Sequence, residues 1–116
     1  MLKIVIAVTM LAVSSPAGHA VGALARNPKN NESAIVVGKP NGPSAKHDAI
    51  LACGDDCEIL STFQHSCMAF AADHRGNGTG YAFGQAASAR EAAERALDKC
   101  QENGGSCTIM ASECDR

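Results

Sequence analysis

The chain has 116 residues, a formal net charge of −2 and six cysteines, and 46 % of its residues are hydrophobic although it contains no Trp, one Tyr and three Phe. This length predicts one domain. The small net charge argues against a surface that binds nucleic acid, and the apolar content argues against intrinsic disorder.

The first twenty residues have the pattern of a secretory signal peptide. Lys3 precedes a short apolar run, Ile4–Val13, and Gly18 and Ala20 place small residues at positions −3 and −1 of a cleavage site after Ala20. The alternative, an uncleaved anchor, needs about 20 apolar residues, which this run does not have. We therefore expect no transmembrane anchor after cleavage and a mature chain, residues 21–116, that is periplasmic or secreted.

The first half of the mature chain predicts two strands and a helix before its cysteines. Strands are expected around Ala23-Leu24-Ala25 and over residues 34–37, where Ile and Val favour β structure. Residues 40–43, Pro-Asn-Gly-Pro, are expected to stay extended until a helix begins at Ser44 and ends at Gly54.

The second half predicts the same elements more clearly. Strands are expected over residues 68–72, 81–83 and 108–111, with a turn region rich in Gly and Asn at 73–80. Ser88 and Glu91 have the spacing of a capping box, and an apolar stripe follows at helical spacing. The members of this stripe are Ala89, Ala92, Ala93, Ala96, Leu97 and Cys100.

The two halves match each other along their length. Ala23-Leu24-Ala25 aligns with Ala69-Phe70-Ala71, and Gly38 aligns with Gly84. The cysteines align as Cys53 with Cys100, Cys57 with Cys107, and Cys67 with Cys114. We predict an α+β fold of two pseudo-symmetric ββαβ units, about 21–67 and 68–116, that share one core because neither unit buries enough apolar surface alone.

Six cysteines in a small exported domain indicate a disulfide framework. A zinc site formed by Cys53, Cys57, His65 and Cys67 is the alternative, which fits a reducing compartment better than an exported chain. Three cysteines in each half require at least one disulfide between the halves if all six are paired.

Six cysteines allow 15 connectivities, of which three treat corresponding cysteines alike. Two of these join residues near the two ends of one strand, where an extended seven-residue step spans about 23 Å against about 6 Å between bridged Cα atoms. The favoured pairs are therefore Cys53–Cys57, Cys100–Cys107 and Cys67–Cys114, the last of which is expected to join the halves.

These features resemble the bacterial family of exported proteins called "domain of unknown function 4189". The resemblance rests on the Ala-Leu-Ala segment, the two aligned glycines, the Ser-Ala helix starts at Ser44 and Ser88, the cysteines, and the junction Cys67-Met68-Ala69-Phe70-Ala71. It covers the whole mature chain. It implies the fold of tandem units but transfers no catalytic residue.

The mature chain contains three histidines and no recognisable catalytic, cofactor-binding or metal-binding constellation. His47, His65 and His74 are each expected at the surface. Because rigid frames present function on loops, the candidate contact surfaces are residues 39–43 and the 73–80 turn, with Asp73, His74, Arg75 and Asn77 as contact residues.

The leading hypothesis is a non-enzymatic binding module, without a cofactor, for an unknown protein or cell-envelope component. The rivals are a secreted effector that acts on another cell, a small hydrolase or redox protein, and a purely structural role. The cysteine spacings, Cys-x₃-Cys and Cys-x₆-Cys, differ from the Cys-x₂-Cys spacing of many redox sites.

Overall fold

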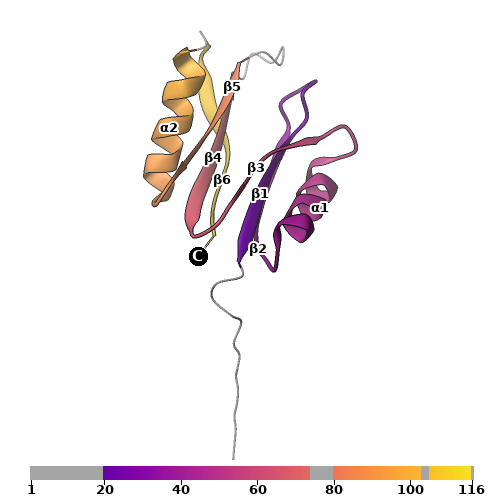
Figure 1. Ribbon diagram of the computed structural model, residues 1–116. Helices are drawn as coiled ribbons and strands as arrows, with labels where there is room; N and C mark the ends of the chain where they lie inside the picture. Colours follow the sequence, from indigo (N-terminus) through magenta and orange to yellow (C-terminus); the bar gives the residue numbers. More distant parts are fainter. Residues whose placement is uncertain (1–19, 74–79, 103–104, 116) are drawn as a thin grey trace, which may run out of the picture.

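The computed structural model describes residues 20–73, 80–102 and 105–115, within which the chain forms six strands and two helices (Figure 1). In chain order they are β1 (Val21–Arg26), β2 (Ser33–Lys39), α1 (Gly42–Cys53), β3 (Glu58–Phe63), β4 (Ser66–Asp73), β5 (Tyr81–Ala86), α2 (Ala89–Glu102) and β6 (Cys107–Asp115). The predicted α+β class and the order of two ββαβ units are confirmed.

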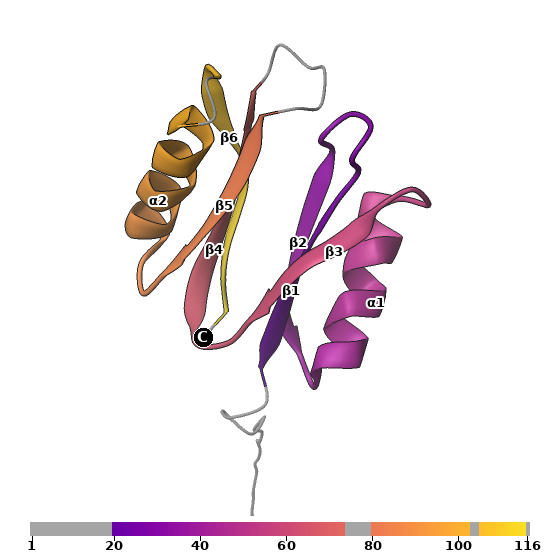
Figure 2. The same ribbon diagram turned by 45° about the horizontal axis from the view of Figure 1, so that its top comes forward.

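Each unit forms a three-stranded antiparallel sheet with its first strand in the centre. The first sheet has the order β2-β1-β3 and the second has the order β5-β4-β6. Helix α1 covers the outer face of the first sheet and α2 covers the outer face of the second, while the inner faces of the sheets pack together (Figures 1 and 2). The domain therefore has four layers in the order helix, sheet, sheet, helix.

Side-chain size alternates along the two central strands, and this alternation decides what packs on each face. Successive residues of a strand point to opposite faces. Most residues that face the helices are alanines, Ala23 and Ala25 on β1 and Ala69 and Ala71 on β4, and each strand adds one residue near its start, Val21 or Cys67. The larger residues of the central strands, together with Ala72 and with Phe63 of β3, face the other sheet and form the shared core that the sequence predicts: Leu24, Phe63, Met68, Phe70 and Ala72.

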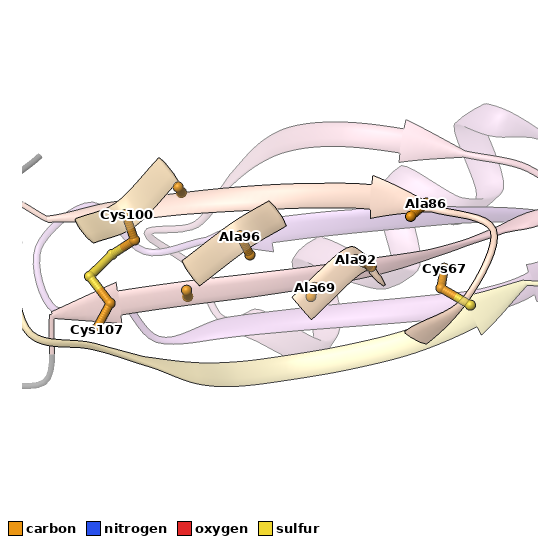
Figure 3. Close-up of a cluster of buried hydrophobic side chains, with 9 residues drawn as sticks. Cys67, Ala69, Ala86, Ala92, Ala96, Cys100 and Cys107 are labelled. Carbon is orange, nitrogen blue, oxygen red and sulfur yellow. A yellow bond between two sulfur atoms is a disulfide. The ribbon is translucent and has the colours of Figure 1, made fainter. Parts of the chain in front are cut away.

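Helix α2 lies close to its sheet because small residues line the contact. Ala92, Ala96 and Cys100 are buried against the second sheet (Figure 3). A Cβ atom at Gly84 of β5 would lie 2.5 Å from the Ala92 carbonyl oxygen, so only glycine permits this approach. At the start of the helix the Glu91 backbone N–H donates to Ser88 Oγ at 3.2 Å, as half of the predicted capping box.

Helix α1 begins earlier than predicted. The expectation of an extended segment up to Ser44 is wrong, because α1 starts at Gly42 and Asn41 is its N-cap. The Asn41 side chain accepts a hydrogen bond from the Ser44 backbone N–H at 2.8 Å. Pro43 fits the first turn because the amide hydrogen it lacks has no partner inside the helix there. The predicted end at Gly54 agrees with the structure.

The three disulfides are Cys53–Cys57, Cys67–Cys114 and Cys100–Cys107, which are the pairs that the sequence favours. The expectation that one of them joins the two halves is wrong. Strand β4 begins at Ser66, so Cys67 belongs to the second sheet, where it pairs in register with Cys114 of β6. The first unit thus holds two cysteines and the second holds four, and each disulfide lies within one unit.

Candidate functional site

The connections between elements lie at two opposite ends of the sheet sandwich. The end where β1 and β4 finish, at the top of Figures 1 and 2, is called the distal end; the end where β1 begins and β6 finishes is called the proximal end. Arg26, Glu58, Asp73 and Tyr81 lie at the distal end, whereas residues 39–43 lie at the proximal end. Segment 39–43 and the described flanks of segment 73–80, Asp73 and Gly80, are therefore at opposite ends of the sandwich.

A buried arginine braces the distal end. The Arg26 side chain, at the end of β1, is almost inaccessible, and its guanidinium carbon lies 3.7 Å from the centroid of the Tyr81 ring of β5. Its Nε donates to Asn31 Oδ1 at 2.7 Å, and its Nη1 lies 3.4 Å from Glu58 Oε2 of β3. This side chain of β1 thus links the β1–β2 turn and the start of β3 to the second sheet. Its hydrogen bonds and cation–π contact offset the burial of its charge.

The turn between β1 and β2 is built to place Asn31 beside this arginine. Asn31 has a positive φ of 61°, a conformation that asparagine tolerates better than most residues, and its backbone N–H donates to the Asn27 carbonyl at 2.8 Å. Its side chain is buried, and its Nδ2 has no hydrogen-bond partner among the described residues. The turn also contacts the connection after α1 through Lys29 and Asp56, 3.5 Å apart and both exposed.

Two of the three disulfides fix connections at the distal end. Cys53–Cys57 closes the connection between α1 and β3, and Cys100–Cys107 closes the connection between α2 and β6 (Figure 3). Both join the last turn of a helix to the start of the next strand. Both connections are therefore held covalently, and the one between α1 and β3 is also held by Arg26 through Glu58.

Of the four contact residues predicted from the sequence, the structure describes one. Asp73 ends β4, is half-buried, and its backbone N–H donates to the Gly80 carbonyl at 2.8 Å. A Cβ atom at Gly105 would lie 2.8 Å from Asp73 Oδ2, so this carboxylate lies against the connection between α2 and β6. His74, Arg75 and Asn77 lie outside the described residues.

The structure does not bring the predicted metal-site or histidine residues together. The zinc alternative is wrong, because Cys53 and Cys57 form one disulfide and Cys67 forms another. His47 and His65 are both exposed, on α1 and on the β3–β4 turn. Over the described ranges, no group of three or more His, Cys, Asp or Glu side chains has a geometry that could hold a metal ion.

At the proximal end, the segment 39–43 is fixed to helix α1. The Lys39 ammonium lies 2.8 Å from Asp48 Oδ2. A side-chain hydrogen bond from this lysine holds the pKa of the Asp48 carboxyl below its ordinary value. Together with the Asn41 cap, this contact makes the segment part of the frame around the helix start.

Sequence reasoning did not single out Arg26, Asn31 and Tyr81. Their meeting depends on the register of β1 against β3, which pairs Arg26 with Glu58, and on how the two sheets face each other. The available signal was an isolated arginine at the end of an apolar strand, followed by an asparagine-rich turn.

The comparisons with known proteins agree with the sequence analysis. Residues 21–114 match the family described as "Domain of unknown function (DUF4189)". No curated protein and no solved structure matches the chain. No helix in the described part of the chain is long and apolar enough to cross a membrane.

Proposed function

Because the chain belongs to the DUF4189 family, whose description assigns no activity, we propose a function from its structure: an exported binding module that presents its distal end to a protein or cell-envelope component. The proposed location is the periplasm or the exterior, after removal of residues 1–20. The chain acts without a cofactor and without covalent chemistry in this proposal.

The disulfides support export. All six cysteines are paired, and such bonds persist in oxidising compartments and are rare in the reducing cytosol. Because all six cysteines are paired, the protein has no free thiol that could act as the nucleophile of a redox reaction.

The observation that carries the binding proposal is the concentration of bracing at one end. Two disulfides and a buried arginine all fix the flanks of distal connections. A loop whose ends are held loses less conformational freedom when it binds a partner, so such bracing favours affinity. The proposed contact residues are Asp73, described at the end of β4, and His74, Arg75 and Asn77 beyond it.

The test compares the two ends of the domain. The mature chain, immobilised, is used to capture partners from periplasmic extract and culture supernatant of the producing bacterium, beside a variant in which residues 74–79 are replaced by Gly and Ser. The matched control alters the proximal end by Pro40→Ala and His65→Gly, which leaves the Asn41 cap intact.

We expect the distal replacement to abolish capture of the partner that the unaltered chain retains, and the proximal variant to keep it. Unchanged capture by the distal variant would show that residues 74–79 do not bind the partner. Loss of capture in the proximal variant alone would place the site at the opposite end. Recovery of the mature chain only from culture supernatant would favour the secreted effector.

A further inference from the structure

Asp115, the last described residue of β6, is a buried carboxylate that is only half satisfied. Its side chain is 1 % exposed. Oδ1 accepts a hydrogen bond from the Gly38 backbone N–H of β2 at 2.9 Å, whereas Oδ2 is buried and has no hydrogen-bond partner among the described residues. A buried carboxylate oxygen without a partner is costly, so its position calls for a donor or a cation.

The residue that lies at this corner of the domain is Val21, the first residue of β1. Val21 pairs with Lys39, the neighbour of the glycine that binds Asp115. A β-bulge between Val21 and Ala23 places Gly38 in the irregular part of the β1–β2 ladder. Both views show β6 ending beside the start of β1 (Figures 1 and 2).

We infer that Asp115 is the built-in binding site for the mature amino terminus: cleavage after Ala20 converts the Val21 amide nitrogen into an ammonium group, which pairs with Asp115 Oδ2. The inference rests on the export part of the proposed function, which supplies the cleavage. Before cleavage the Val21 nitrogen belongs to a peptide bond, with no charge and one N–H. Hydrolysis of the Ala20–Val21 bond adds one water and gives that nitrogen three N–H donors and a positive charge.

The neighbouring lysine is paired elsewhere and does not act as the partner of Asp115 Oδ2. Lys39, which follows Gly38, is engaged by Asp48 at 2.8 Å. Val21 itself is only 6 % exposed, so its ammonium would be partly removed from water and would gain more from a carboxylate partner than an exposed one does. The pair would tie the first strand of the first sheet to the last strand of the second, a link that no disulfide makes.

The experiment is a double-mutant cycle on two chains produced without the leader. One begins at Val21 and the other begins at Ala20, which moves the ammonium by one residue; each is made with Asp115 and with Asp115→Asn, disulfides intact. We expect the chain that begins at Val21 to have a folding equilibrium constant at least tenfold larger in urea titration, which is about 1.4 kcal/mol. The Asp115→Asn substitution should remove this difference.

The proposal is overturned if the two chains are equally stable, or if the difference between them persists in Asp115→Asn. It is also overturned if Arg116→Gln, in the chain that begins at Val21, removes the stabilisation instead, because Oδ2 then belongs to that side chain. Production of the chain from Val21 keeps this result independent of whether a partner is ever captured.

A second readout does not need the Asp115 variant to fold. An amine-reactive ester labels the amino group of Val21, and mass spectrometry measures the labelling rate, with the exposed Lys46 of the same molecule as the internal reference. We expect the amino terminus of the folded chain to react at least tenfold more slowly than that of a short peptide that begins Val-Gly-Ala. Equal rates would contradict the pairing of Val21 with Asp115. Sequencing of the exported protein should give Val21 first, and another first residue overturns the inference.

Discussion

The two units repeat one arrangement of elements but fix their helices in different ways. Gly38 and Gly84 occupy aligned positions in β2 and β5. At Gly84 a Cβ atom would collide with the α2 backbone, whereas Gly38 has open space around it and a positive φ of 74°, and its N–H binds Asp115. The same residue type is thus required by packing in the second unit and by backbone conformation in the first.

The disulfides show the same asymmetry between the units. The second unit has a disulfide across its sheet, Cys67–Cys114, whose partners have a sequence separation of 47. It has this disulfide in addition to a short one of the kind that both units possess. The first unit has only the short one, Cys53–Cys57, with a separation of 4. The second unit is therefore the more strongly constrained half, and the first depends more on contacts with it.

The largest expected effect comes from removing the cross-sheet disulfide. Loop-closure entropy predicts that Cys67→Ala with Cys114→Ala lowers the free energy of unfolding by about 4 kcal/mol, against about 2 kcal/mol for Cys53→Ala with Cys57→Ala. Urea unfolding at pH 7 measures both. Equal losses in the two double variants would show that the second unit is not the more constrained one.

The aligned glycines give the next effect. Gly84→Ala should cost about 3 kcal/mol because the new methyl group meets backbone atoms of Ala92 and Ala96, which cannot move without shifting the helix. Gly38→Ala adds no collision and should cost about 1 kcal/mol from its positive φ alone. Thermal unfolding of the two variants ranks them, and the reverse order would contradict the assigned roles.

The brace between the units comes third. Arg26→Met should lower the free energy of unfolding by about 2 kcal/mol, since it removes the contact with Tyr81 and leaves Asn31 Oδ1 buried without its donor. Lys29→Met is the matched control, because its exposed pair with Asp56 should contribute at most about 0.5 kcal/mol. Similar losses for both variants would mean that Arg26 does not brace the sheets.

The smallest effect concerns the polar contacts that hold each helix to its sheet. In the first unit Lys39 pairs with Asp48, whereas in the second Arg95 donates to the Gln85 carbonyl at 2.7 Å, a contact without a carboxylate. The pKa of Asp48 is lowered by its lysine partner, so this pair stabilises the fold above the ordinary carboxyl pKa, near 4, and the contribution is lost as pH falls through the lowered value. Carboxyl NMR titration should show that the pKa of Asp48 is higher in Lys39→Met than in the unaltered chain. An unchanged pKa would show that Lys39 does not lower it.

Local patterns in the sequence predicted the elements but not the contacts between the two units. The apolar stripe of α2, the Ser88 cap and the apolar strand over residues 68–72 follow short-range rules. The cap and the strand are confirmed, and the stripe is confirmed except for Ala89, which is exposed. The start of α1 was missed because two prolines suggested an extended chain, although Pro43 is favourable in a first helical turn.

The division between the units and the distal brace depend on strand register. In the sequence, Cys67 fits the end of the first repeat and the start of the second equally well. Its pairing in register with Cys114 of β6 assigns it to the second unit. Arg26 meets Tyr81 through the packing of two sheets that are far apart in sequence. Periodicity within one element carries no information on either relation.

No disulfide joins the two units, and the core between their sheets holds them together as one domain. This arrangement is tested by placing a protease site in the exposed turn between Gln64 and His65, cutting the folded chain there, and comparing native with denaturing gels without reductant. The cut halves should migrate together in the native gel and separate under denaturing, non-reducing conditions. Halves that separate in the native gel would contradict the shared core, and halves that stay joined under denaturing conditions without reductant would reveal a disulfide between the units.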